Sequence, residues 1–284
     1  MHVVGHEDPW EFSARTRSFL LEDEARHNLL LGIATTLIER PEAYPEFDLW
    51  TVERNGMVVA VATKTPPFNL AVSRSGTDGA ISALARAIHE EGVGIPGVTG
   101  AIPEADEFAR AWAALSGTTP RLAMAQRIYQ LTSVKPVRGV IGRMREATTS
   151  DRDLLVRWTI EFGAEALPKD EPMEAERLVD LRLRGRGVGL VLWEDDEPVS
   201  FAGYGGPTPN GIRIGPVYTP PALRRNGYAG ALVAGLSRRL LDEGRTFCFL
   251  YTDLTNPTSN RIYVNIGYEP VCDSRNYRFG PAGP

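Results

Sequence analysis

The sequence predicts a mixed α/β protein built from two similar halves, each a twisted sheet flanked by helices. Three observations support this. Short apolar and β-branched runs alternate with segments of helical periodicity along the whole chain. The two halves present these elements in the same order, and 284 residues are enough for two domains of about 140 residues. Hydrophobic residues make up 43% and charged residues 24%, which is typical of a globular protein with a buried core.

The second half reads as β-α-α-β-β-β-α-β-α-β-β. Residues 149–151 offer N-caps for its first helix, and Gly244 and Gly267 end later helices. The continuous apolar run 247–252 is typical of a buried parallel strand that follows a crossover helix. We expect strands at 143–147, 188–194, 198–205, 212–219, 247–252, 268–272 and 275–279, and helices at about 150–167, 174–184, 226–243 and 256–266.

The first half follows the same order. Asn55–Gly56 is the turn dipeptide of a β-hairpin, Pro66–Pro67 interrupts the chain, and Gly92 and Gly117 end helices. We expect helices at 24–40, 79–91 and 103–115, and strands at 49–53, 57–63, 69–73, 98–101 and 122–132.

The ends of the helices align the two halves. Glu91–Gly92 matches Glu243–Gly244 at an offset of 152 residues, and Gly117 falls close to Gly267 at nearly the same offset. We interpret the halves as a tandem duplication of one domain.

The predicted boundary is a segment of little periodicity that carries Pro136 and Gly139. The predicted organisation is an N-terminal domain at 1–132, a linker at 133–141 and a second domain at 142–284.

Charge and composition exclude several classes of function. A formal net charge of −5 and a pI near 5.5 disfavour non-specific binding to nucleic acid. The sequence shows neither a signal-peptide pattern nor a long apolar run, so we expect a cytoplasmic protein with no membrane partner. The four histidines lie in the first half and both cysteines in the second, so we expect neither a Cys–His nucleophile nor a metal site.

The most informative segment is 215–233, where a strand runs through a tight loop directly into an apolar-faced helix. Backbone N–H groups at a helix N-terminus lack intrahelical partners, and the aligned peptide dipoles add partial positive charge. Gly227 allows a close backbone approach and Ala229 is small, while Arg224 and Arg225 add full charges. The segment is therefore suited to bind a pyrophosphate.

This segment resembles the coenzyme A signature of the GNAT superfamily of N-acetyltransferases, Arg/Gln-x-x-Gly-x-Gly/Ala, which Arg224, Gly227 and Ala229 meet. Pro221 precedes Arg224 as in the family's Val-x-Pro-x-x-Arg form, and Thr219 replaces the Val with another β-branched residue. The resemblance implies an acetyl-CoA site formed by Val217, Thr219, Arg224, Arg225, Asn226, Gly227, Tyr228, Ala229, Gly230, Asn256 and Ser259.

A second motif follows the next predicted strand. Asn256, Ser259, Tyr263 and Gly267 match the family's Asn-x-x-Ser/Ala-x-x-x-Tyr-x-x-x-Gly-Tyr/Phe pattern, and the first three lie near one helix face. The resemblance covers about 142–279. A GNAT-like domain placed before a complete one is similar to the glycine N-acyltransferase-like branch of the superfamily.

The resemblance implies direct acyl transfer to a primary amine in a ternary complex. The pantetheine of acetyl-CoA would lie between two splayed strands, with the backbone of Val217 and Thr219 polarising the thioester carbonyl. Tyr263 would protonate the leaving thiolate as general acid.

Three carboxylates are candidates for the general base. Glu161 and Glu165 lie on the first helix of the second half, and Asp253 lies at a strand end. We prefer Asp253 because it lies beside the Asn256 motif.

The first half lacks both motifs. Its corresponding loop carries Gly76 and Gly79 without an Arg/Gln-x-x-Gly-x-Gly/Ala pattern, and Ala113 stands nearest to Tyr263 in register. We expect a degenerate GNAT-like domain that does not bind CoA and instead shapes the acceptor site or supports the sheet. The offset of 152 sets Val72, Ser75 and Thr77 opposite Arg224, Gly227 and Ala229.

An alternative function is a non-catalytic acyl-CoA-binding or sensing module, but the complete pair of motifs, including Tyr263, favours an enzyme. The partner would be a small-molecule amine or an amino acid, selected by segments such as 162–174 whose composition is generic. GNAT sheets often pair, so a homodimer is a further alternative.

Overall fold

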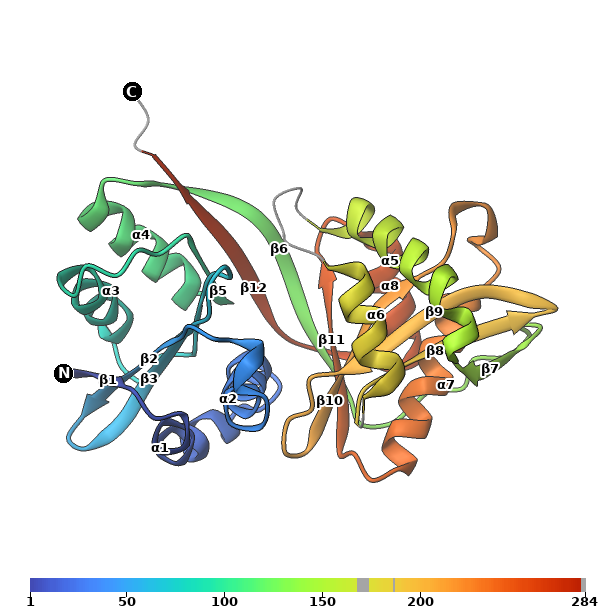
Figure 1. Cartoon of the computed structure of the whole chain (residues 1–284), viewed down its shortest axis with the longest axis horizontal. Helices are drawn as coiled ribbons and strands as arrows, with labels where there is room; N and C mark the ends of the chain where they lie inside the picture. Colours follow the sequence, from blue (N-terminus) through green and yellow to red (C-terminus); the bar gives the residue numbers. More distant parts are fainter. Residues whose placement is uncertain (168–173, 186, 282–284) are drawn as a thin grey trace. The chain divides into compact units, whose positions relative to one another are not determined.

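The computed structural model describes residues 1–167, 174–185 and 187–281, and the chain divides into two compact units. Unit 1 comprises Met1–Arg127 and Val271–Pro284, and unit 2 comprises Ile128–Pro270. Figure 1 labels their helices and strands. Within the described ranges, every helix is too short or too polar to span a membrane.

Unit 2 contains a mixed sheet. Its strands are the end of β6 (Thr119–Leu131), β7 (Arg143–Glu146), β8 (Gly189–Asp195), β9 (Glu197–Gly205), β10 (Gly211–Tyr218) and β11 (Phe247–Asp253). Their order in the sheet is β6-β11-β10-β9-β8-β7. Strands β7, β8, β9 and β10 pair antiparallel with one another, whereas β10 and β11 pair parallel.

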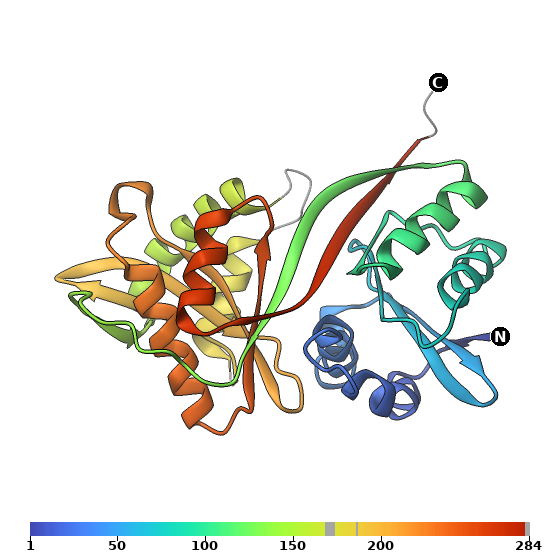
Figure 2. The same cartoon turned by 180° about the vertical axis from the view of Figure 1, so that it is seen from behind.

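Helices cover both faces of this sheet. They are α5 (Arg152–Ala166), α6 (Ala175–Arg184), α7 (Tyr228–Asp242) and α8 (Pro257–Ile266), with 3₁₀ turns at Thr149–Asp151 and Pro221–Leu223. Helices α5 and α6 lie in front of the sheet in Figure 1, and α7 and α8 lie in front in Figure 2. Trp158 and Val179 pack in the α5/α6 core, whereas Ile212 and Ile214 of β10 pack in the α7/α8 core. Because side chains alternate along a strand, Arg213 lies on the α5/α6 face.

Unit 1 repeats this arrangement element by element. Its strands are β1 (His2–His6), β2 (Asp48–Arg54), β3 (Met57–Lys64), β4 (Leu70–Val72), β5 (Gly97–Ala101) and β12 (Glu269–Gly280). Their order is β1-β2-β3-β4-β5-β12, with β4 and β5 parallel. Its helices are α1 (Pro9–Leu21), α2 (Asn28–Glu39), α3 (Ala80–Glu90) and α4 (Glu104–Ser116), with a 3₁₀ turn at Pro41–Ala43. The predicted mixed α/β fold built from two similar repeats is therefore confirmed.

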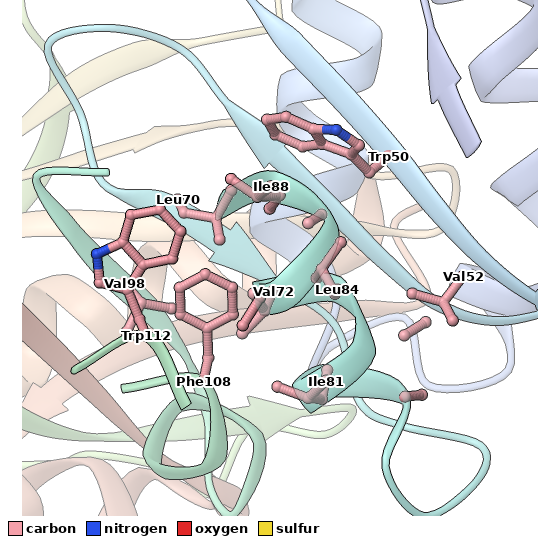
Figure 3. Close-up of a cluster of buried hydrophobic side chains, with 14 of the residues drawn as sticks. Trp50, Val52, Leu70, Val72, Ile81, Leu84, Ile88, Val98, Phe108 and Trp112 are labelled. Carbon is pink, nitrogen blue, oxygen red and sulfur yellow. The ribbon is translucent and has the colours of Figure 1, made fainter. Parts of the chain in front are cut away.

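The core of unit 1 beneath α3 and α4 is apolar and tightly packed (Figure 3). Ile81, Leu84 and Ile88 of α3 are completely buried, as their spacing of three and four residues predicts for one helix face. Phe108 and Trp112 of α4 stack with their ring centroids 5.9 Å apart. Each such side chain contributes about 1.5–3 kcal/mol on burial.

The last strand of each half ends outside the unit that holds the rest of that half: most of β12 belongs to unit 1, and the last residues of β6, 128–131, belong to unit 2. Strand β12 pairs antiparallel with β5, from Ser274 opposite Ala101 to Arg278 opposite Gly97. The end of β6 neighbours β11 in unit 2, where Tyr129 joins the α7/α8 core. The pairing of Ser274–Arg278 with β5 accounts for the place of β12 in unit 1, whereas the division into domains at 1–132 and 142–284 stays a prediction.

Three element predictions need correction. The two strands expected at 268–272 and 275–279 form one continuous strand, β12, which its pairing with β5 holds extended. The helix expected at 24–40 begins only at Asn28, after a run of turns. Strand β1 and helix α1, which open the chain, were not predicted.

Candidate active site

The parallel strands β10 and β11 separate toward their carboxyl ends, as the resemblance implies. Their pairing joins Gly211–Arg213 to Phe247–Phe249 and ends there, although both strands continue. A bulge in β10 lies just beyond this point, where pairing with β9 skips from Ile214 to Val217. The edge of β10 that faces β11 is therefore left without a strand partner over the bulge.

Two predicted acetyl-CoA residues lie at this end of β10. Val217 is half-buried and packs against the α7/α8 core. Thr219 follows the strand, and its Oγ1 lies 2.9 Å from Oγ of Ser200, which donates to the Tyr218 carbonyl at 2.9 Å. These contacts fix the end of β10 while leaving its other edge open.

The loop after β10 leads into the N-terminus of α7, which no side chain caps. Gly227 is the N-cap residue, and its φ of 82° lies in the left-handed region that favours glycine. Arg225 also has a positive φ, of 71°, and the Asn226 side chain donates to the Leu223 carbonyl at 3.1 Å. The first N–H groups of this 15-residue helix therefore remain available, and the helix dipole favours an anion there.

The first turn of α7 brings together the remaining residues of the signature. The Tyr228 hydroxyl donates to Asp195 at the end of β8 at 2.6 Å, which anchors the ring on the sheet. Gly230 faces α8, since a Cβ added there would lie 3.7 Å from a methyl group of Ile262. Small residues at Ala229 and Gly230 thus keep the helix start accessible and close to α8.

Arg224 is engaged with α5. Its Nη2 donates to both carboxylate oxygens of Glu165, at 3.0 and 2.7 Å, and its Nε donates to the Thr219 carbonyl at 2.9 Å. Both side chains of this ion pair are more than 40% exposed, so it contributes about 0–1 kcal/mol. A phosphate could displace Glu165 at little cost.

The start of α8 holds the second motif. Asn256 is the N-cap residue, and its Oδ1 accepts from the Ser259 N–H at 3.0 Å. The neighbouring Asn260, which was not among the predicted site residues, donates to the Asp253 carbonyl at 2.9 Å and accepts from the Thr252 hydroxyl at 2.6 Å. The Oδ1 atom of Asn256 therefore supports the helix start, although the residue is exposed.

Tyr263 is buried at the base of the site, in the α7/α8 core. Its ring meets Tyr268 edge to face, with the centroids 5.8 Å apart. Burial raises the pKa of Tyr263 to about 12. The hydroxyl has no hydrogen-bond partner among the described residues and is not sealed from solvent. It is therefore a protonated donor without an acceptor.

The three candidate bases occupy different positions. Oδ1 of Asp253 accepts from both the N–H and the hydroxyl of Thr255, at 2.7 Å each, and so stabilises a turn. Glu165 is paired with Arg224, as described above. Glu161 accepts from the Tyr218 hydroxyl at 3.0 Å, and burial together with this carboxylate raises the pKa of Tyr218 to about 12.

One buried cation of unit 2 was not predicted from the sequence. Arg182 of α6 is only 9% exposed, and its Nη1 donates to the Gly215 carbonyl within the β10 bulge at 2.7 Å. Arginine on a surface helix is ordinarily solvated, so the sequence carried no clear signal. Part of the segment expected to select the acceptor, 168–173, lies outside the described residues.

The corresponding place in unit 1 is already filled by carboxylates of α4. Gly79 is the N-cap of α3 with φ 77°, as at the start of α7. Oε1 of Glu107 accepts from the N–H and the hydroxyl of Ser82 at 3.1 and 2.7 Å, and Oε1 of Glu104 accepts from the Ser75 N–H at 2.8 Å. A hollow of about 600 Å³ opens beside this helix start, and Glu107 lines it.

This comparison corrects the offset of 152 at the start of the helix. Gly79 and Gly227 are equivalent because each is the left-handed N-cap of its helix. Helix α3 has 11 residues and α7 has 15, so an offset that fits the ends of the two helices does not fit their starts. The residues Val72, Ser75 and Thr77 are thus not the counterparts of Arg224, Gly227 and Ala229. At the next helix the expected match holds, since the N–H of each C-cap glycine donates to Ala113 in unit 1 and to Tyr263 in unit 2.

Comparisons with known proteins support the same fold. Residues 207–278 match the family model described as FR47-like protein. A solved Drosophila protein aligns with a TM-score of 0.70 at 14% identity, over 99% of both chains. A GCN5-related N-acetyltransferase from Sphaerobacter thermophilus aligns with a TM-score of 0.60 at 17% identity, over 99% of this chain and 96% of its own. A tandem GNAT protein from the clavulanic acid biosynthesis pathway aligns with a TM-score of 0.59 at 13% identity, over 100% and 99%. No curated protein matches the sequence.

The protein therefore has the fold of tandem GNAT proteins along its whole length, and the predicted resemblance to the GNAT superfamily is confirmed. The family model covers the end of unit 2 that carries both motifs. Assignment to the glycine N-acyltransferase-like branch stays a prediction.

Proposed function

We propose that unit 2 transfers the acetyl group of acetyl-CoA to a primary amine by direct attack in a ternary complex. One juxtaposition carries the proposal: separated parallel strands, an uncapped helix N-terminus and an unpartnered buried hydroxyl follow one another in a single unit. These are the three groups that a thioester donor needs, namely a backbone edge, an anion site and a proton donor.

The residues at the start of α7 fit the pyrophosphate of CoA. Backbone N–H groups of 227–230 would bind it, because no side chain occupies them. Arg225 is exposed and Arg224 is held only by an exposed ion pair, so both would add charge to the site. The backbone of Val217 and Thr219 would hold the pantetheine and orient the thioester carbonyl.

Tyr263 would donate its proton to the thiolate of CoA as the thioester breaks. Its high pKa keeps the hydroxyl protonated at neutral pH. The absence of a partner among the described residues leaves the O–H bond free to point at the sulfur. No Cys–His pair is required, because the amine attacks the thioester directly.

Asp253 and Glu161 are the two carboxylates we propose for removal of the amine proton. Asp253 has one oxygen engaged in a turn, whereas Glu161 holds the Tyr218 hydroxyl on the α5/α6 face. Rate–pH profiles of Asp253→Asn and Glu161→Gln distinguish them. Loss of the base depresses the rate most at low pH, where the amine is protonated. Unchanged profiles in both variants would remove both carboxylates from this role.

We propose that unit 1 does not bind CoA and that the first half of the chain supports the sheet of unit 2 through residues 128–131 at the end of β6. The carboxylates of Glu104 and Glu107 already bind the backbone N–H groups that a phosphate would need. A second phosphate there would meet repulsion from both charges.

The proposed activity is tested by titrating CoA into the protein and by measuring thiol release from acetyl-CoA with a panel of amines and amino acids. We expect one CoA bound per chain and transfer to at least one amine class. Binding without transfer would support the sensing alternative, and the absence of CoA binding would refute the assigned site.

A further inference from the structure

The guanidinium of Arg182 lies on the α5/α6 face of the sheet, directly over β9. A Cβ added at Gly203 would lie 1.9 Å from its Nη1, so the glycine is what makes room for the cation. The same Nη1 donates to the Gly215 carbonyl at 2.7 Å, which places Arg182 on the bulge where β10 leaves β11. Arg182 is buried, with only 9% of the residue exposed.

Arg213 reaches the same place from β10. It is the last β10 residue that pairs with β11, and it faces the α5/α6 side. A Cβ added at Gly206 would lie 3.7 Å from the guanidinium of Arg213. A Cβ added at the preceding Gly205 would lie 4.0 Å from Nη2 of Arg182. Consecutive glycines at the end of β9 thus bring the two cations into one neighbourhood.

Neither cation has an anionic partner in the part of the chain that the structure describes. No carboxylate forms an ion pair or a hydrogen bond with Arg182 or Arg213 there. Burial and the charge of Arg213 lower the pKa of Arg182 to about 9. Two neighbouring guanidinium groups in a desolvated place are unfavourable alone, and a bound anion would relieve both the burial and the repulsion.

A negative group lies on the same face beyond the bulge. Tyr218 follows Arg213 on the α5/α6 side of β10, and its hydroxyl donates to Glu161 of α5 at 3.0 Å. The face therefore presents two cations at the bulge and a carboxylate toward the end of the strand. This sequence of charges complements a molecule that carries a carboxylate at one end and an amine at the other.

We propose that Arg182 and Arg213 bind the carboxylate of the acceptor, which makes the acceptor an amino acid rather than a simple amine. This inference rests on the proposed function, because the bulge adjoins the place assigned to the thioester. The planar guanidinium of arginine matches a carboxylate with two parallel hydrogen bonds. Arg182 would bind the carboxylate through the N–H groups that do not donate to the Gly215 carbonyl.

The test compares each amino acid with its own primary amide as acceptor, for example glycine with glycinamide. The wild-type protein should favour the acid over the amide. Arg213→Gln should lower kcat/KM for the acids by about 10- to 100-fold, mainly through KM, because a hydrogen bond to a charged group is lost. The amides should be unaffected. Arg157→Gln removes the same charge from an exposed position of α5 and should change nothing.

A binding measurement separates this inference from the proposed function. Amino acids and their amides are titrated calorimetrically into the CoA-loaded protein, wild type and Arg213→Gln. If no amine is acetylated but acids bind in an Arg213-dependent manner, the transfer function fails and the carboxylate subsite stands. Equal binding of acids and amides, or equal loss of both in Arg213→Gln, would overturn the subsite.

Discussion

Replacing Gly227 by alanine tests whether the start of α7 is the CoA site. An alanine at φ 82° costs about 1–2 kcal/mol, because an L side chain is strained in the left-handed region. Its methyl carbon would also lie 2.9 Å from Cγ2 of Val140, which is closer than such carbons approach, so the loop or the Val140 side chain must shift. Relief of the backbone strain at this residue would misplace the N–H groups that would face the pyrophosphate. The loss of one hydrogen bond to a charged group, roughly 1.5–3 kcal/mol, raises the Kd for CoA by about 10- to 100-fold.

Unit 1 supplies the matched control. Gly79 is the N-cap of α3 with φ 77°, and an added Cβ would lie 3.6 Å from the terminal methyl group of Met1, an ordinary contact. Gly79→Ala should therefore lower the stability by a similar amount without changing CoA binding. Calorimetric titration of CoA and denaturant unfolding of both variants give the two readouts. CoA binding by Gly227→Ala at wild-type affinity, or equal weakening by Gly79→Ala, would refute the assignment.

Two further predictions concern the framework of the site. Asp151→Asn should lower the free energy of unfolding at pH 7 by roughly 1–3 kcal/mol, because Asp151 accepts from Arg145 at 2.8 and 2.9 Å and from the Thr148 N–H at 2.8 Å. These bonds lower the pKa of Asp151 to about 2, so the contribution is complete above about pH 4 and disappears as the pH falls toward 2. Urea unfolding of both proteins across this range checks it, and a difference that is constant with pH would contradict the reasoning. Ending the chain after Pro270 should accelerate amide hydrogen exchange at Gly97–Ala101, which loses its pairing with β12, and leave β8 and β9 protected. Equal acceleration in β8 and β9 would contradict the assignment of β12 to unit 1.

The order of elements was predictable because local signals mark most of them. Glycines in the left-handed region end α4 and α8, and apolar periodicity marks the buried faces. Helix α1 could also have been predicted, since Asp8 caps its start and Pro9 occupies its first position. Its buried residues Phe12 and Thr16 lie four apart, but the polar residues between them masked the stripe.

The place of β12 in unit 1 could not be predicted from the sequence. Alternation along a strand identifies which residues are buried, but it does not identify the sheet edge that the strand joins. The pairing of Ser274–Arg278 with β5 depends on contacts such as the ion pair between Arg275 and Asp106 at 2.6 Å, which join residues distant in sequence. The same limit applies to α3, which is one turn shorter than α7 and so breaks a constant offset between the halves.

Some residues of the candidate site could likewise be predicted from the sequence, and others could not. The candidate phosphate-binding loop and Tyr263 were predicted because short motifs carry them, and the structure places Gly227 at an uncapped helix start and Tyr263 in a buried position. Arg182 was missed because its role depends on the missing side chain at Gly203, on a different element. An arginine on the buried face of a helix, packed against glycines of a strand, can be recognised only once the fold is known.

Thiol release from saturating acetyl-CoA by the wild-type protein and by Tyr263→Phe tests the central claim most directly. The hydroxyl has no partner among the described residues, so its removal should leave the stability and the Kd for CoA unchanged. The rate of transfer to an amine should fall by about 10²- to 10⁴-fold, as expected for loss of a general acid. A wild-type protein that transfers acetyl groups, and a stable Tyr263→Phe variant that binds CoA but transfers slowly, would agree with the account. Full activity of that variant, or no transfer by the wild type to any amine or amino acid, would contradict it.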